Sequence, residues 1–151
     1  MKTALSIVGI VFLVILFVLG CFIGFVVYEG NKFDASSKAY VDESVPAIVT
    51  SWSKDELAKR ESSQFRKATS DDEMTALFKR FSELGPLQSY GGSKGDAHMN
   101  VTSATGLQVT GTYIAQASFQ NGKAEIKVNL IQVEGAWQIY GFRVDSPLFL
   151  K

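Results

Sequence analysis

The sequence predicts an α+β fold, in which an apolar N-terminal helix precedes several shorter helices and then an antiparallel sheet. Residues 4–28 contain no charged side chain, residues 34–84 repeat apolar side chains at helical spacing, and residues 97–144 alternate between apolar and polar side chains. A run of helices followed by a run of strands is typical of the α+β class. With 151 residues, the chain has room for one such domain.

The composition argues against several classes of protein. The chain has 15 Lys and Arg and 15 Asp and Glu side chains, so it lacks the net positive charge typical of nucleic-acid binders. Its single cysteine cannot form an internal disulfide. The one histidine, His98, has no cysteine partner for a metal. We therefore expect no nucleic acid, no metal and no cofactor, and the orientation of His98 is left open.

The apolar N-terminal segment predicts a membrane anchor. Residues 4–28 exceed the roughly 20 residues that cross a bilayer as a helix. Because Lys2 and the amino terminus should stay in the cytoplasm, we expect a signal anchor over residues 1–30 and a domain over residues 31–151 in the periplasm. The protein would then cross the bacterial inner membrane once. Two alternatives are open: a lipoprotein lipidated at Cys21, and ordinary signal cleavage.

Two glycines in this segment predict close helix packing. Gly20 and Gly24 lie about one turn apart, and paired small residues let two helix backbones approach each other. The pair could therefore favour self-association of the helix; the alternative is that glycine is simply common in membrane helices.

The next region is predicted to be helical. Val41, Val45, Ile48 and Trp52 are spaced by three or four residues, which places them on one face of a helix. Pro46 has no backbone N–H, so we expect it to kink this helix or to divide it in two.

Two capping boxes mark where further helices begin. Ser53-Lys54-Asp55-Glu56 predicts the start of a short helix. Ser70-Asp71-Asp72-Glu73 predicts a second one, whose apolar stripe continues to Leu84 and which Gly85-Pro86 ends. Residues 61–69, which lie between them, are expected to be a solvated connection.

The strand region begins with a strand that allows two orientations, and a hairpin with a strong turn signal follows. Residues 97–102 are expected to form a strand with Met99 and Val101 inward, preceded by a short edge strand over residues 87–92 and a flexible loop. A two-residue loop after this strand would instead place His98 and Asn100 inward. Asn121-Gly122 predicts a tight turn, because both positions tolerate positive φ. A two-residue turn there pairs Phe119 with Ala124 and Tyr113 with Leu130, which places the apolar side chains on one face.

Glu134-Gly135 predicts the following turn and hence the register of the last strand. Counting from it pairs Leu130 with Ile139 and Val128 with Gly141. The core face of the last strand would then carry Trp137, Ile139, Gly141 and Arg143. The reverse face would carry Tyr140, Phe142 and Val144, which predicts that this face is either covered or in contact with a partner.

Two stretches carry a resemblance to a known superfamily. Residues 84–90 read Leu-Gly-Pro-Leu-Gln-Ser-Tyr, and residues 135–144 read Gly-Ala-Trp-Gln-Ile-Tyr-Gly-Phe-Arg-Val. With the helices-then-strands layout, residues 33–146 resemble the nuclear-transport-factor-2-like (cystatin-like) superfamily. The resemblance implies a curved sheet wrapped around helices into a cone, and implies little about activity, since this fold has many functions. An anchor followed by such a domain is similar to the inner-membrane assembly components of type IV secretion systems.

The expected function is that of a membrane-tethered interaction or scaffold domain. It would be an accessory or assembly subunit of a larger membrane complex, with a protein partner or further copies of itself. The alternative is a small-molecule binder that uses the cone interior, with Tyr113, Trp137 and Arg143 at the ligand. An enzyme is not expected, because the predicted register places no acidic residue deep in the cone to act as a general base.

Overall fold

The computed structural model describes the backbone of residues 2–150 and the side chains of residues 13–25, 28 and 31–150. Helices precede strands, as the α+β prediction requires, and this prediction is confirmed. The elements in chain order are α1 Lys2–Val49, α2 Lys54–Ala58, α3 Ser63–Ala68, α4 Asp71–Phe81, η1 Ser82–Leu84, β1 Leu87–Thr102, β2 Gly106–Phe119, β3 Gly122–Val133, β4 Ala136–Asp145 and η2 Pro147–Leu150.

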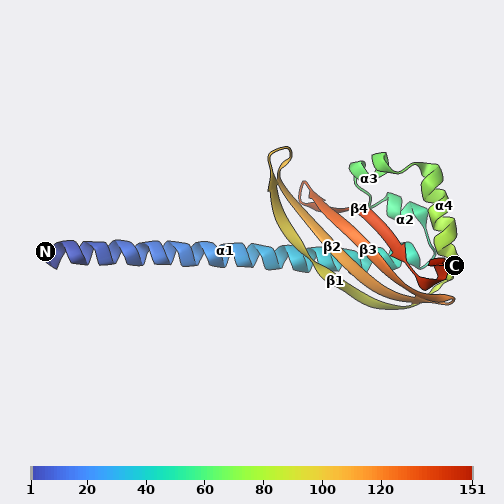
Figure 1. The fold of residues 1–151 in the computed structure, drawn as a ribbon, viewed down its shortest axis with the longest axis horizontal. Coiled ribbons are helices and arrows are strands. Elements are labelled where there is room, and N and C mark those ends of the chain that lie inside the picture. The colour runs from blue at the N-terminus through green and yellow to red at the C-terminus, as the bar shows by residue number, and fades with distance from the viewer. Residues whose placement is uncertain (1, 151) are drawn as a thin grey trace.

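The N-terminal helix α1 is the longest element of the fold. It has 48 residues and runs without a break from the apolar segment into the domain. Figure 1 shows its N-terminal half standing clear of the other elements and its C-terminal half lying along the curved sheet. One helix therefore connects an isolated apolar segment to the hydrophobic core.

The expected transmembrane signal anchor is wrong. Within the described part of the chain, no helix is both long enough and apolar enough to cross a membrane. The segment expected as an anchor is also not a separate element, because α1 continues past residue 30 through polar residues such as Asn31 and Lys32.

Pro46 lies inside α1 and does not divide it, so of the two expected outcomes the division into two helices is wrong. The helix ends at Val49, so the missing N–H of Pro46 affects only its last turns. Val45, Ile48 and Val49 around the proline are fully buried. This packing stabilises the helix where its own hydrogen bonding is incomplete.

Trp52 turns the chain after α1. Its φ of 48° lies in the left-handed region, which is uncommon for a residue with a side chain. The indole N–H donates to the carbonyl oxygen of Gly85 at 3.0 Å, and the ring packs on Phe81 and Phe119 with centroid distances of 5.7 and 5.0 Å. These contacts hold the turn in place and close one end of the core.

The two predicted capping serines both begin helices. Ser53 Oγ accepts the N–H of Glu56 at 3.2 Å and starts α2. At α4 the capping box is complete, since Ser70 Oγ accepts the N–H of Glu73 and the Glu73 carboxylate accepts the N–H of Ser70 at 2.9 Å. Residues 63–68, expected to be a connection, form α3, which is too short to show apolar periodicity.

The four strands form an antiparallel meander in the order β1-β2-β3-β4. β1 is one strand of 16 residues, whereas two pieces and a loop were expected. Its pairing with β2 shifts at two places, one of them between Tyr90 and Ser93, where Gly91 and Gly92 lie. These bulges let a glycine-rich stretch remain within the strand.

The hairpin of β1 and β2 extends beyond the part of the sheet that α1 covers (Figure 1). Met99 and Val101 lie in this extension and are exposed, so the expectation that they point into the core is wrong. Met99 and Val101 do lie on the predicted face of the strand, the face of the buried Val109, but no described element covers that face at this end of the sheet.

The turn between β2 and β3 lies one residue before its predicted position. Phe119 pairs with Gly122, so Gln120-Asn121 forms the turn and each pair differs by two residues from the predicted one. The turn N–H groups donate to the carbonyl oxygens of Pro86 and Leu84 at 3.1 and 3.0 Å. A shift of two residues preserves the faces, so the predicted inward side chains of β2 and β3 still point inward.

A bulge in β4 overturns the expected register of its C-terminal half. Leu130 pairs with Ile139 as predicted, but Asn129 pairs with Gly141, so Tyr140 is an extra residue. A side chain at position 141 would place its Cβ 2.7 Å from Asn129 Nδ2, which explains why glycine stands there. Beyond the bulge, side chains point to the face opposite to the expected one.

The bulge also changes which residues of β4 share a surface. Val144 is buried and Phe142 packs against the core, whereas Tyr140 stays exposed. Arg143, expected inward, is exposed and forms an ion pair with Asp145 at 2.8 Å. The expected outer surface of Tyr140, Phe142 and Val144 therefore does not exist as a set.

The core lies between the inner face of the sheet and a layer of helices, in which α1 is joined by Leu57 of α2, by Met74, Phe78 and Phe81 of α4 and by Leu84 of η1. Its largest fully buried side chains come from both layers and include Val41, Val45, Ile48, Tyr113, Ile126, Val128, Leu130 and Ile139. The chain segment between α2 and α3 pairs with the free edge of β4 at Ile139. Ser62 N–H donates to Ile139 O at 2.7 Å, and Ile139 N–H donates to Arg60 O at 2.8 Å.

Candidate functional site

The structure does not bring together the three residues expected at a ligand. Tyr113 lies beneath α1 with 1% of its surface exposed. Trp137 is half-buried on β4, and its indole N–H donates to Ser36 Oγ at 3.0 Å. Arg143 pairs with Asp145 in solvent because of the β4 bulge. Tyr113 and Trp137 both contact α1, at Ser37 and Ser36, whereas the bulge moves Arg143 to the opposite face of the sheet.

The space expected to be a ligand cavity is occupied by α1. Val41, Val45 and Ile48 are fully buried against the sheet. The Tyr113 hydroxyl lies 2.6 Å from Ser37 Oγ, and burial raises the pKa of this tyrosine. Among the described residues, every buried side-chain polar atom has a hydrogen-bond partner. Within this part of the chain, the core therefore offers a ligand no unpaired buried polar group, and α1 lies where the cavity was expected.

Asp42 fastens α1 to the bulged part of β1. Its Oδ1 accepts hydrogen bonds from Tyr90 Oη at 2.8 Å, Ser93 N–H at 3.0 Å and Ser93 Oγ at 2.7 Å, and its Oδ2 pairs with Lys38. Burial by itself raises the pKa of the Asp42 carboxyl, but the hydrogen bonds from Lys38, Ser93 and Tyr90 outweigh it and hold the pKa below its usual value. This carboxylate therefore has a structural role, because both of its oxygens already bind groups of the same chain.

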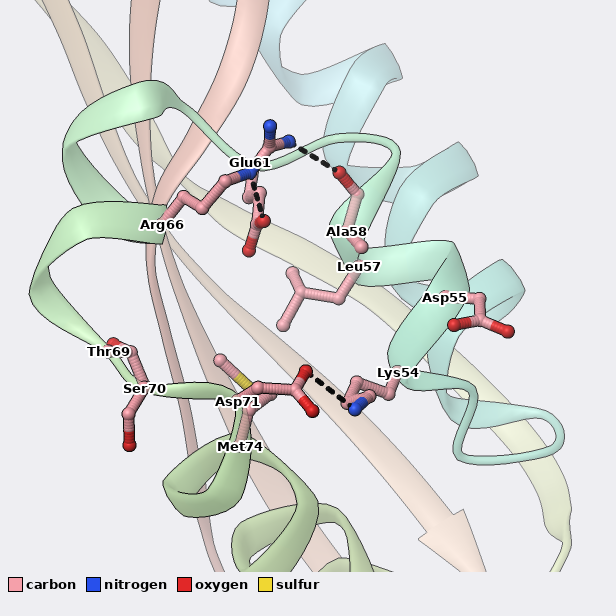
Figure 2. A pocket seen from close by; sticks show the side chains of 10 residues that line it. All are labelled: Lys54, Asp55, Leu57, Ala58, Glu61, Arg66, Thr69, Ser70, Asp71 and Met74. Carbon is pink, nitrogen blue, oxygen red and sulfur yellow. Dashed lines mark hydrogen bonds and ion pairs between the residues drawn. The ribbon is translucent and has the colours of Figure 1, made fainter.

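A surface pocket lies among α2, α3 and the start of α4 (Figure 2). Its volume is about 470 Å³, and Leu57 and Met74 provide an apolar floor. Figure 2 shows Leu57 pointing into this space and Asp55 pointing away from it. The combination of an apolar floor and charged walls suits a small polar ligand in shape.

The two cationic side chains of this pocket are already paired within the chain. Lys54 Nζ lies 2.7 Å from Asp71 Oδ1 and 3.1 Å from Thr75 Oγ1. Arg66 Nε lies 2.7 Å from Glu61 Oε1. An anionic ligand would have to displace these carboxylates, so the pocket is better explained as a packing gap between short, salt-bridged helices.

The described residues offer little for metal binding. Nowhere among them do three or more His, Cys, Asp or Glu side chains gather closely enough to hold an ion. His98 lies on the exposed part of β1, with its Nε2 3.2 Å from Asp96 Oδ2. Its side chain therefore faces solvent.

The largest unpartnered apolar surface lies on α1. Eleven large apolar side chains between Leu13 and Tyr28 are each at least 49% exposed. All described side chains from residue 13 to residue 25 are exposed, and such a run passes more than three times around the helix. The apolar surface therefore surrounds the helix, which is typical of a helix that is covered on all sides.

Gly20 and Gly24 lie in the middle of this surface. A Cβ added at either position would meet no atom within 4 Å, so both glycines leave open hollows on the helix. Cys21 beside them is an exposed free thiol. The packing role of the glycines and the lipidation of the cysteine stay predictions.

A second and smaller apolar surface lies at the tip of the β1–β2 hairpin. Met99, Val101 and Leu107 are 51%, 78% and 63% exposed. Val101 pairs with Leu107 across the two strands, so these side chains form one continuous strip. Both apolar surfaces lie at the end of the domain from which α1 projects (Figure 1).

The sequence patterns did not predict the buried serines of α1 or the hydrogen-bond partners of Asp42. The buried stripe of α1 begins at Ser37 and includes Ser44, both fully or almost fully buried, but only its apolar members were recognised. The helical spacing of Ser37, Val41 and Ser44 was a usable signal, since it matches that of the apolar stripe. The partners of Asp42 were not recognisable, because they depend on how β1 bulges against α1.

Comparison with known proteins yields no match to a family model, to a curated protein or to a solved structure. The resemblance to the nuclear-transport-factor-2-like superfamily therefore stays a prediction, and the function has to be argued from the exposed surfaces and the filled interior.

Proposed function

We propose that this chain is an interaction and scaffold domain that works by holding a protein assembly together. The observation that carries the proposal is the exposed apolar surface of α1 between Leu13 and Tyr28. Contiguous apolar surfaces of this kind are rare on monomers and mark sites of association.

The filled core supports the same function. A binding domain of this size needs a concave site with space and a few converging polar groups. Here α1 fills the concave side of the sheet, and the buried hydroxyl groups of Tyr113 and Ser37 bond to each other. No specific observation favours a small-molecule ligand or a reaction, so interaction is the function that the geometry supports best.

The attachment of α1 suits a scaffold. Asp34 Oδ1 accepts the N–H of Ala97 at 2.6 Å, Asp42 bonds to Tyr90 and Ser93, and Ser36 accepts the indole N–H of Trp137 at 3.0 Å. These contacts join the helix to both edge strands of the sheet. A partner that binds the projecting half of α1 would therefore also position the folded domain.

Photo-crosslinking in intact cells tests this proposal. A photoreactive phenylalanine analogue replaces Phe17 or Phe25 on the apolar surface, or Lys127 on the exposed outer face of β3 as a control. We expect protein adducts from positions 17 and 25 and far fewer from position 127. Adducts with lipid alone, or protein adducts at equal yield from all three positions, would contradict the proposal.

A further inference from the structure

We propose that residues 13–25 of α1 bind the same segment of further copies of this chain, in a parallel helical bundle in which Gly20 and Gly24 line the closest contact. The inference rests on the proposed function, because it names the partner of the same apolar surface. Its minimal unit is a pair of chains.

The exposed area is large enough for such an interface. Eleven large apolar side chains, from Leu13 to Tyr28, are between 49% and 73% exposed. If each offers on the order of 100 Å², one copy presents roughly 1,000 Å² of apolar surface around the whole helix, to be shared among neighbouring copies in the bundle. Its full burial would match the roughly 800 Å² per partner of a standard stable interface.

The chemistry of the surface favours an identical partner. Residues 4–28 contain no charged side chain, so identical segments do not repel each other when they meet. The described surface also has no polar side chain between residues 13 and 20 that a dissimilar partner could recognise by hydrogen bonding. An equally long and uncharged helix is its complement, and every further copy of the chain brings one.

The glycines define where two helices come closest. Gly20 and Gly24 are about one turn apart, and a Cβ at either position would meet nothing within 4 Å. Two small residues at this spacing let helix backbones approach and gain van der Waals contact along their length. The face with the glycines therefore makes the first contact, and the opposite apolar face remains for additional copies.

Parallel packing is the orientation that matches both the glycines and the charges. An antiparallel pair that set Gly20 against Gly24 would set Glu29 opposite Ile15 and Lys32 opposite Phe12. Charged side chains would then lie against apolar ones without a partner, which is unfavourable. In a parallel pair, each residue meets its own copy, so apolar residues meet apolar residues. Glu29 and Lys32 then lie beyond the apolar contact, and the folded domains gather at one end.

Sedimentation of the purified full-length chain in a mild non-ionic detergent measures the association. We expect masses of two or more chains, and we expect the double variant Gly20→Leu and Gly24→Leu to weaken association roughly tenfold or more. The matched control is Val18→Leu with Phe22→Leu, which has the same spacing on the opposite face and should associate as the unchanged chain does. The thermal unfolding of the domain should be the same for all of these chains, because residues 13–25 lie outside its core.

Disulfide crosslinking tests the orientation. Cys21 is exposed and is the one cysteine of the chain, so it should oxidise to a Cys21–Cys21 dimer. In the Cys21→Ser background, single-cysteine variants Val14→Cys and Tyr28→Cys should each crosslink with themselves. Crosslinks that form only in a mixture of these two variants would overturn the parallel bundle.

The result that overturns self-association is a monomer. A monomeric chain that binds phospholipid vesicles and stays monomeric on them would show that lipid, and not a second copy, covers α1. A monomeric chain that still gives protein adducts of another mass at Phe17 would overturn this inference and leave the proposed function standing. A monomeric chain without any protein adduct would overturn both.

Discussion

Replacing Asp42 with alanine should loosen the attachment of β1 to α1 and destabilise the domain. Asp42 Oδ1 accepts hydrogen bonds from Tyr90 Oη, Ser93 N–H and Ser93 Oγ, all between 2.7 and 3.0 Å. The variant removes this one acceptor and with it all three hydrogen bonds.

The size of the effect follows from the burial of the donors. Ser93 is 3% exposed, so water cannot readily replace the carboxylate, and a buried donor left without a partner costs about 1–3 kcal/mol. Tyr90 is only half-buried, and the loss of its hydrogen bond adds about 1 kcal/mol. The free energy of unfolding should therefore fall by about 2–4 kcal/mol, which lowers Tm by roughly 5–15 °C for a chain of this size.

Urea unfolding followed by circular dichroism measures this free energy. The matched control is Lys38→Ala, which removes the ion-pair partner of Asp42 but leaves its hydrogen bonds to β1 in place. Because the Lys38 side chain is 49% exposed, this control should cost no more than about 0.5 kcal/mol.

The dependence on pH gives a second and independent test. The pKa of Asp42 is lower in the folded chain than its unfolded value of about 3.9. Its charge-dependent stabilisation is therefore complete above pH of about 4 and is lost as the pH falls through the lowered folded pKa. The difference between the native chain and Asp42→Ala should be constant near neutral pH and shrink in acid.

Two outcomes would refute this reasoning. One is an Asp42→Ala chain whose free energy of unfolding lies within about 0.5 kcal/mol of that of the native chain, since a loss of buried hydrogen bonds costs more than this. The other is a Lys38→Ala chain that is destabilised as strongly as Asp42→Ala, which would assign the stabilisation to the exposed ion pair.

Two further predictions concern the packing of α1 and β1. In a double-mutant cycle measured by urea unfolding, Ser37→Ala and Tyr113→Phe should show a coupling energy of about 1 kcal/mol, because the two hydroxyl oxygens lie 2.6 Å apart in the core. Strictly additive effects on the free energy of unfolding would show that this hydrogen bond contributes nothing. Gly95→Ala should destabilise the domain by about 1–3 kcal/mol or more, because its Cβ would lie 2.0 Å from the carbonyl oxygen of Thr112 and the strands would have to separate. Gly20→Ala, at an open site, should leave domain unfolding unchanged, and an equal loss in both variants would contradict the clash.

Local sequence signals were reliable where neighbouring residues determine the structure. Ser53 and Ser70 begin helices because each serine reaches an N–H three residues ahead. Glu134 and Gly135 form the predicted turn with φ of 49° and 81°, the two positive values that a type I′ turn requires. The alternation of β2 correctly indicated which of its side chains point inward, up to the exposed hairpin tip.

The candidate site shows the limit of such signals. Arg143 was expected beside Tyr113, and Phe142 on an outer surface, because the strand was counted without its bulge. The bulge lies beside the pair of Gly141 with Asn129, which belongs to another strand, so counting along β4 alone does not reveal it. Likewise, the apolar surface of α1 was recognised as a segment, but its expected role as a transmembrane span is wrong.

The sequence by itself determined the order of helices and strands, the helix caps, the turn at Glu134-Gly135 and the faces of β2 and β3, since these depend on propensity and periodicity over a few residues. Only the tertiary structure decided that α1 passes through Pro46, that the β2–β3 turn sits at Gln120-Asn121, that β4 bulges at Tyr140 and that Asp42 joins α1 to β1. Each of these is set by contacts between segments far apart in the chain, where burial and hydrogen bonding outweigh the local preference.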